Sequence, residues 1–152
     1  EGVPLRHVKP HGALYNLAAR EIEVATAVAV AVRSVDPSLY LVGLCGSAMV
    51  AAAREAGLKF AAEAFADRGY RKDGRLVSRR EHGAVLDDPG GVAERVVRMV
   101  RDGEVTTVDG TDIAIAPKTV CVHGDTPGAV ALLRAIRGRL EEEKIGVKSF
   151  SG

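Results

Sequence analysis

The sequence lacks the features that mark membrane, secreted and nucleic-acid-binding proteins. Its 152 residues carry a formal net charge of +1, with acids and bases interspersed, which gives no electrostatic case for nucleic acid or an anionic membrane. No apolar run is long enough to span a bilayer, since the longest candidate covers only residues 24–32. No basic-then-apolar signal peptide opens the chain. We therefore expect a cytoplasmic protein with no membrane partner and no nucleic-acid partner.

Several ligand-binding and redox motifs are also missing. The two cysteines, Cys45 and Cys121, each lie in apolar sequence, so we expect buried thiols rather than a disulfide. Neither G-x-x-x-x-G-K-[ST] nor G-x-G-x-x-G after a strand is present, so a bound nucleotide would use neither loop. No Cys/His spacing of the zinc-finger kind occurs, and we assign no metal ligand.

The composition and the order of the segments predict an α/β fold. With 47% hydrophobic and 27% charged residues the chain is typical of a globular protein, and its length suits a single domain over residues 1–152. Strands are predicted at 5–9, 39–44, 58–64, 119–123 and 147–150, helices at 13–33, 47–56, 91–101 and 127–143, and a hairpin at 105–108 and 112–116. This alternation implies mostly parallel strands joined by helical crossovers, with a long ordered excursion at 67–89.

Local signals support the helices. The predicted caps are Ser47 for the second helix, the segment Asp87-Asp88-Pro89 for the third, and Thr126 with Pro127 for the last. The third helix carries Val92, Val96, Val97 and Val100 on one stripe, and Met99 and Val100 are predicted to lie in the core.

Titratable residues stand at the end of the first strand. His7, Lys9 and His11 alternate before Gly12, and alternate residues of a strand share a face. A surface lysine beside a histidine is the ordinary explanation. Because Lys, Pro, His and Gly occur together at a strand end, where α/β enzymes build their sites, we favour a functional role.

Two further strand ends carry polar residues. His123 and Asp125 follow the strand at 119–123, and we favour a functional role for both, with Thr126 mainly a cap. Glu63 and Asp67 alternate onto one face, and Arg68 follows. These three residues suit either acid–base work with anion recognition or an ion-paired loop start. The basic residues at 71–80 are usually a solvated face, and covering an anionic ligand is the weaker interpretation.

Five blocks in the same order resemble one family. They are HVKPHGALYN, E-x-F-A-D-R-x-Y, D-G-x-L-V-x-R, G-A-V-L-x-D-P and V-C-V-H-G-D-T-P-G-A-V. Together they are similar to the LamB/YcsF family, the A subunits of 5-oxoprolinase, from residue 3 to about residue 150. Full-length members have additional amino-terminal blocks with Asp, Glu and His. Since this chain opens on Glu1 and enters a strand at once, we expect it to be the carboxyl-terminal part of a longer protein.

The resemblance implies a fold, an activity and partners. The implied fold is a partial TIM-like (β/α) barrel of the glycoside hydrolase/deacetylase type. The implied activity is the ATP-dependent opening of 5-oxo-L-proline to L-glutamate, with ATP as co-substrate and 5-oxoprolinase subunits B and C as partners. Two alternatives remain open, namely a metal-dependent deacetylase or amidohydrolase of the same fold, and a non-catalytic scaffold subunit.

Site roles follow as hypotheses from that activity. Lys9 neutralises charge on the lactam oxygen or its phosphate, and His11 and His123 exchange protons, with Asp125 orienting one of them. Glu63 and Asp67 position the substrate amide or the water. Arg68 holds the substrate carboxylate, and His7, Tyr70 and Asn16 complete substrate binding. These roles require His11 and His123 to face one pocket.

Overall fold

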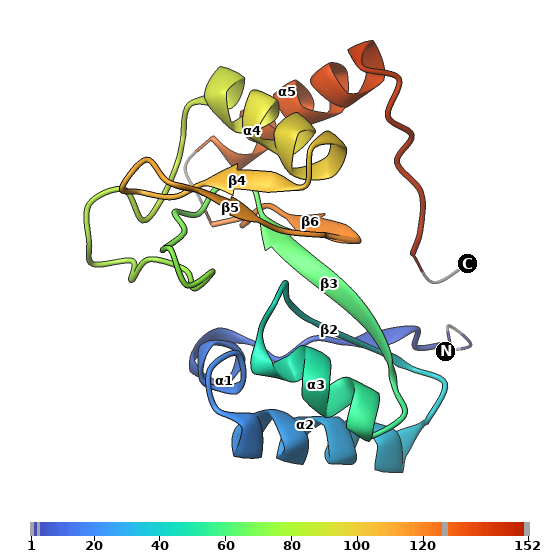
Figure 1. Ribbon diagram of the computed structural model, residues 1–152. Helices are drawn as coiled ribbons and strands as arrows, with labels where there is room; N and C mark the ends of the chain where they lie inside the picture. The colour runs from blue at the N-terminus through green and yellow to red at the C-terminus, as the bar shows by residue number, and fades with distance from the viewer. Residues whose placement is uncertain (1, 3, 126–127, 151–152) are drawn as a thin grey trace. The chain divides into compact units, whose positions relative to one another are not determined.

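The computed structural model describes residues 2, 4–125 and 128–150 and divides the chain into two compact units (Figure 1). The first unit comprises residues 1–63 and 149–152, and the second comprises residues 64–148. The helices are α1 (Gly12–Ala18), α2 (Ile22–Val35), α3 (Ala48–Glu55), α4 (Pro89–Arg101) and α5 (Ala129–Glu142). The strands are β1 (His7–Val8), β2 (Tyr40–Leu44), β3 (Lys59–Phe65), β4 (Glu104–Thr106), β5 (Asp112–Ala114) and β6 (Thr119–Cys121). The expected single domain over residues 1–152 stays a prediction.

The four-stranded sheet confirms the α/β expectation. Its strand order is β1-β2-β3-β6, and both β1 with β2 and β2 with β3 pair in parallel. The central strand β2 is a continuous apolar run whose residues 41–44 are buried, as expected for a strand covered on both faces. In the first unit, α2 packs against α3, and α1 packs against α2 (Figure 1).

The helix predicted over 13–33 is two helices, α1 and α2. α1 ends at Ala18, Ala19 keeps helical backbone angles, and Glu21 has extended ones. The carbonyl of Ala19 accepts a hydrogen bond from the backbone N–H of Ala48 at 3.1 Å. This tertiary bond at the start of α3 takes the carbonyl that a continuous helix would use itself. Neither proline nor glycine marks the break, so no local signal in the sequence indicates it.

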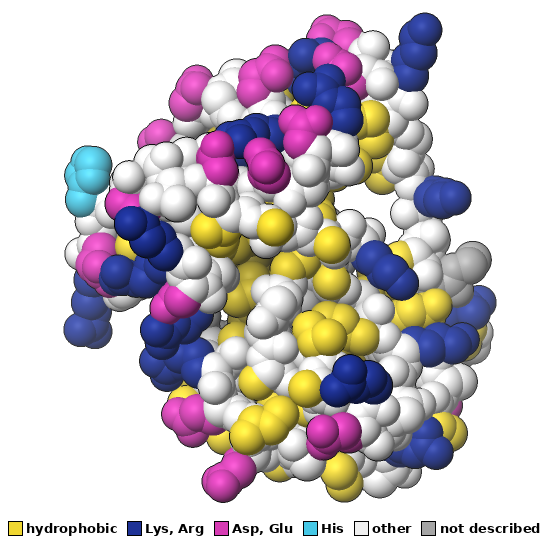
Figure 2. Space-filling model, in the orientation of Figure 1, with side chains coloured by type: hydrophobic (Ala, Val, Ile, Leu, Met, Phe, Trp, Pro, Cys, Tyr) yellow, Lys and Arg dark blue, Asp and Glu magenta, His cyan; other side chains and the backbone are white. Residues whose placement is uncertain are grey.

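In the second unit α4 and α5 pack together over a shared core. The two helices bury Val92, Val96, Leu132 and Ile136 against one another. The predicted hairpin is confirmed as the antiparallel pair β4–β5, with Gly110 at a positive φ of 80° in its turn. Over α4 and the hairpin, Figure 2 shows acidic and basic side chains interspersed, as the sequence indicates.

Three local predictions differ from the structure, and a fourth is not tested by it. Val100 is 42% exposed. It follows Val92 by eight residues, which places it about 80° around the helix from the buried Val92. Residues 147–150 form no strand, and the Phe150 ring contacts His7 and Tyr40 instead. Ser47 precedes α3, but its side chain makes no capping bond. The predicted cap and first turn at residues 126–127 lie outside the described residues.

The expected burial of the two cysteines is found in part. Cys45 is buried, whereas Cys121 is only partly buried. Within residues 2, 4–125 and 128–150, the helices are too short or too polar to cross a bilayer.

Candidate functional site

A buried carboxyl group and an imidazole form a pair in the second unit. Asp67 lies two residues after β3 and His123 two residues after β6. His123 Nδ1 is 3.0 Å and 3.1 Å from the two carboxyl oxygens of Asp67, and the backbone N–H of His123 donates to the same group at 3.0 Å. Asp67 is fully buried, whereas the His123 side chain stays 21% exposed. The buried carboxyl group therefore fixes an imidazole that reaches the surface.

An aromatic stack fixes the plane of the same imidazole. The Phe65 ring lies parallel to the His123 ring, with 5.2 Å between centroids and 17° between planes. Phe65 and Asp67 therefore use one face of the strand end, as the alternation predicts. With Nδ1 turned to Asp67, Nε2 is the ring nitrogen that can exchange a proton with a substrate.

Tyr70 and Arg68 are buried residues close in sequence to Asp67, and their polar groups bond to the backbone. The buried Tyr70 hydroxyl accepts a hydrogen bond from the Phe65 N–H at 2.8 Å. The Arg68 guanidinium, only 7% exposed, donates to the carbonyls of Ala84 at 2.9 Å and Val77 at 2.6 Å. Burial lowers the pKa of Arg68, and the nearby Arg79 adds to this effect. These contacts favour a role in holding the excursion at 67–89, and substrate binding by either residue stays a prediction.

Asp125 does not contact His123 as an orienting group would. Its carboxylate forms an ion pair with Arg79 at 3.1 Å, and both side chains are exposed. The hydrogen bond from Arg79 is the largest cause of the lowered pKa of Asp125. Asp67 makes the contact with Nδ1 of His123, and the expectation that Asp125 orients an imidazole stays a prediction.

The first unit holds a second group of polar side chains around Glu63. Lys9 Nζ lies 2.6 Å from Glu63 Oε1, and the Tyr15 hydroxyl donates to Glu63 Oε2 at 2.9 Å. Lys9 follows β1, Tyr15 lies in α1 and Glu63 lies in β3, so three elements meet there. Glu63 is 4% exposed, and the Lys9 side chain is 22% exposed. An ammonium held in this way can face negative charge on a substrate oxygen.

The remaining predicted residues of the first unit lie at its surface. His7 is exposed and its ring meets Phe150 edge-on at 5.6 Å. His11 is the exposed residue before α1, and the Asn16 amide donates to the Gly12 carbonyl within that helix. His11 lies in the first unit and His123 in the second, and the expectation that they face one pocket stays a prediction.

Tyr15 is the residue that sequence reasoning misses. The alternation that selects Lys9 ends with the strand, and Tyr15 lies one helix turn beyond Gly12. A helical residue can reach the strand end only by pointing back over the sheet, which a strand pattern does not show. Its position within the block HVKPHGALYN is the only available signal.

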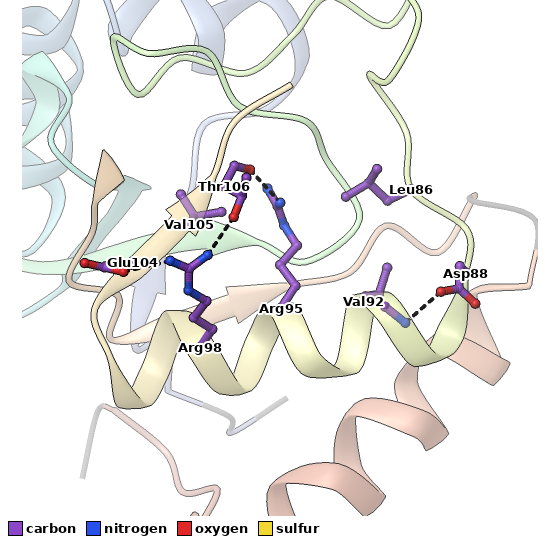
Figure 3. Close-up of a pocket in the computed structure, with 9 residues that line it drawn as sticks. Leu86, Asp88, Val92, Arg95, Arg98, Glu104, Val105 and Thr106 are labelled. Atoms are coloured by element: carbon purple, nitrogen blue, oxygen red, sulfur yellow. Dashed lines mark hydrogen bonds and ion pairs between the residues drawn. The ribbon is translucent and has the colours of Figure 1, made fainter. Parts of the chain in front are cut away.

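A cavity of about 300 Å³ lies elsewhere in the second unit (Figure 3). Arg95 and Arg98 project from α4 and donate to the carbonyl and hydroxyl oxygens of Thr106. Arg98 also pairs with Glu104 and Asp112. These guanidinium groups are already paired with the residues that line the cavity. We therefore interpret the cavity as a result of the packing of α4 on the hairpin and not as a ligand site. Among residues 2, 4–125 and 128–150, no three His, Cys, Asp or Glu side chains gather as a metal site.

Comparison with known proteins gives consistent matches. The chain matches the LamB/YcsF family over residues 1–152. It is 54% identical to the 5-oxoprolinase A subunit of Mycobacterium avium over 149 residues, which cover 98% of this chain and 59% of that protein. It is 49% identical to the 5-oxoprolinase A subunit 1 of Agrobacterium fabrum, over 99% of this chain and 59% of the relative.

A solved structure agrees with the fold. The crystal structure of lactam utilization protein from Thermus thermophilus matches with a TM-score of 0.89 and 44% identity, covering 98% of this chain and 59% of that one. The chain therefore spans about 59% of the length of the curated relatives that it matches.

Proposed function

The chain belongs to the LamB/YcsF family, and on this premise we propose that it acts in the A subunit of an ATP-dependent 5-oxoprolinase. The reaction opens 5-oxo-L-proline to L-glutamate and converts ATP to ADP and phosphate. Identities of 54% and 49% to proteins named as 5-oxoprolinase A subunits support this assignment. Because the chain spans 59% of those proteins, the activity is assigned to the full-length subunit.

The Asp67–His123 pair is the observation that carries the proposal. Opening a lactam requires a proton to leave the attacking oxygen and a proton to reach the ring nitrogen. Asp67 holds Nδ1 of His123 and so presents Nε2 for both transfers. The Phe65 stack keeps the ring from turning away. A positioned imidazole contributes about 10²–10⁴-fold to such a reaction.

The Lys9–Glu63 pair has a separate chemical role in the proposal. The ammonium of Lys9 offsets negative charge that develops on the lactam oxygen or on a phosphate attached to it. Buried Glu63 fixes that ammonium at 2.6 Å. His11 is proposed as a second proton carrier, and its exposed position before α1 leaves it accessible to substrate.

We propose the co-substrate, the partner subunits and the cellular location on the basis of the family. ATP supplies a phosphoryl group to the amide oxygen, which opens the carbonyl carbon to attack by water. The C–N bond then breaks as the ring nitrogen takes up a proton, and hydrolysis of the resulting acyl phosphate gives glutamate and phosphate. Subunits B and C are the proposed partners. Substrate contacts by His7, Asn16, Arg68 and Tyr70 are kept as predictions. A cytoplasmic location is part of the same proposal.

We also propose that the sheet is part of a TIM-like barrel of the glycoside hydrolase/deacetylase type. Parallel strands joined by helices, as in β1-α2-β2-α3-β3, are the repeating unit of that architecture. In a closed barrel β1 gains a second neighbour. Amide exchange at Val8 should therefore be slower in the full-length subunit than in residues 1–152 alone, and equal rates would contradict closure.

The decisive experiment measures glutamate formed from 5-oxoproline and ATP by the full-length subunit with subunits B and C. We expect His123→Asn to lower kcat by about 10²-fold or more. The matched control is His82→Asn, an exposed histidine of the excursion, which should leave turnover unchanged. No glutamate from the wild-type complex would refute the proposed reaction.

Other outcomes identify the alternatives. Chelator-sensitive release of acetate without ATP would indicate a metal-dependent deacetylase. Glutamate formation that survives both His123→Asn and His11→Asn would indicate a scaffold subunit.

A further inference from the structure

Glu63 is a buried carboxyl group that receives a hydrogen bond on each oxygen. Lys9 contacts Oε1 at 2.6 Å and the Tyr15 hydroxyl donates to Oε2 at 2.9 Å. Glu63 and Tyr15 are each 4% exposed, so water does not compete freely for these bonds. Two donors on opposite oxygens define the plane of a carboxyl group, whereas one donor leaves it able to rotate.

Tyr15 contacts both members of the ion pair. Its hydroxyl bonds to Glu63, and Lys9 Nζ lies 5.7 Å from the centre of its ring. A cation at this distance from an aromatic ring is attracted to the face of the ring. Tyr15 comes from α1, whereas Lys9 directly follows β1 and Glu63 lies in β3. The side chain of Tyr15, which projects from α1, therefore contacts both Lys9 and Glu63.

We propose that Tyr15 is a positioning residue that acts through Glu63 on the ammonium of Lys9. By holding Oε2, it keeps Oε1 directed at Lys9. This inference rests on the proposed function only for its effect on turnover. The positioning itself is a property of the first unit and can be measured without any reaction.

The first test measures the chemical reactivity of Lys9. The full-length subunit is treated briefly with acetic anhydride, and acetylation at Lys9 is compared with that at exposed Lys148 by peptide mass spectrometry. In Tyr15→Phe the contact between Glu63 and Lys9 loosens, so the Lys9 amine is more often open to the reagent and we expect several-fold faster labelling of Lys9. The control is Tyr40→Phe, a tyrosine of β2 whose ring meets Phe150. It should leave the ratio unchanged.

The second test uses a double-variant cycle on turnover. Tyr15→Phe should lower kcat by about tenfold, as expected for losing a hydrogen bond to a charged group, with KM within about twofold. In a Lys9→Met background the same change should cost nothing further, because Tyr15 acts through Lys9. Tyr15→Phe keeps the ring, and a thermal unfolding scan checks that the variant is folded.

The outcomes separate this inference from the proposed function. Unchanged Lys9 labelling in Tyr15→Phe would refute the positioning role whatever the enzyme does. A full additional loss of kcat in the Lys9→Met background would also refute it. If the wild-type complex forms no glutamate, the proposed function fails, while the labelling result still decides the role of Tyr15.

Discussion

At the scale of single residues, buried carboxyl groups organise both groups of polar side chains. Glu63 and Asp67 lie four positions apart along the chain, and each is almost fully buried. Burying a carboxyl group is costly unless donors surround it. Glu63 has Lys9 and Tyr15, and Asp67 has the backbone and ring of His123. The donors therefore offset the burial and are themselves held in place.

The sequence identifies these residues better than it identifies their partners. Lys9, Glu63, Asp67 and His123 are predicted because polar side chains at the ends of apolar strands stand out. Which carboxyl group meets which cation depends on strand order and on side-chain direction, which alternation does not encode. For this reason the sequence alone favours Asp125 as the group that orients an imidazole, whereas Asp67 makes that contact with His123.

Replacing Arg68 tests whether it supports the excursion or binds substrate. Arg68→Met removes the donor to the carbonyls of Ala84 and Val77. Leaving these carbonyls without a donor should cost about 2–3 kcal/mol of unfolding free energy, measured by urea denaturation. Proteolysis within residues 71–82 should accelerate. A variant with wild-type stability but a raised KM for 5-oxoproline would instead establish substrate binding.

The control for this prediction is another arginine of the same excursion. Arg75 is exposed, and its guanidinium contacts the carboxylate of Asp73 two residues away. Arg75→Met should leave the urea midpoint and the proteolysis rate unchanged, because exposed ion pairs contribute little.

At the scale of the elements, local signals predict helix starts better than helix interiors. Asp88 before Pro89 indicates the start of α4. The Asp88 side chain accepts a hydrogen bond from the Gly91 N–H at 2.7 Å. The break after α1 is not predictable, because it depends on a bond from Ala48 on another helix. Local chemistry can be read from neighbouring residues, whereas a tertiary bond cannot.

Removing the cap of α4 should weaken the second unit. Asp88→Ala leaves the first turn of α4 without its side-chain acceptor, and we expect a loss of about 1 kcal/mol in the free energy of unfolding. The matched control is Asp87→Ala. Within the part of the chain that the structure describes, the Asp87 side chain makes no hydrogen bond or ion pair. Equal losses in the two variants would contradict the capping role.

At the scale of the whole molecule, the net charge is near zero, but individual charged side chains form close ion pairs. Arg98 bonds to Glu104 and Asp112, and Thr106 also donates to Asp112. The hydrogen bond from Arg98 is the largest cause that lowers the pKa of Asp112 to about 2. The hydrogen bond from Thr107 lowers the pKa of Asp109 to about 2. The hairpin therefore depends on ionised carboxylates.

These two pKa values predict how stability responds to acid. The folded pKa values lie below the ordinary value of 3.8, so folding favours the ionised form. Their contribution is present above about pH 3.8 and is lost as the pH falls towards about 2. The urea midpoint should decrease over this range, and less steeply in Asp112→Asn. An Asp87→Asn control should retain the wild-type slope.

The docking of Phe150 on the first unit has a consequence for the order of synthesis. Its ring contacts His7 and Tyr40, whereas the second unit is one uninterrupted stretch of residues 64–148. The second unit is therefore complete in sequence before the residue that gives the first unit its last aromatic contact is added. We expect chains released just short of Phe150 to protect the second unit from protease, while the first unit stays more susceptible.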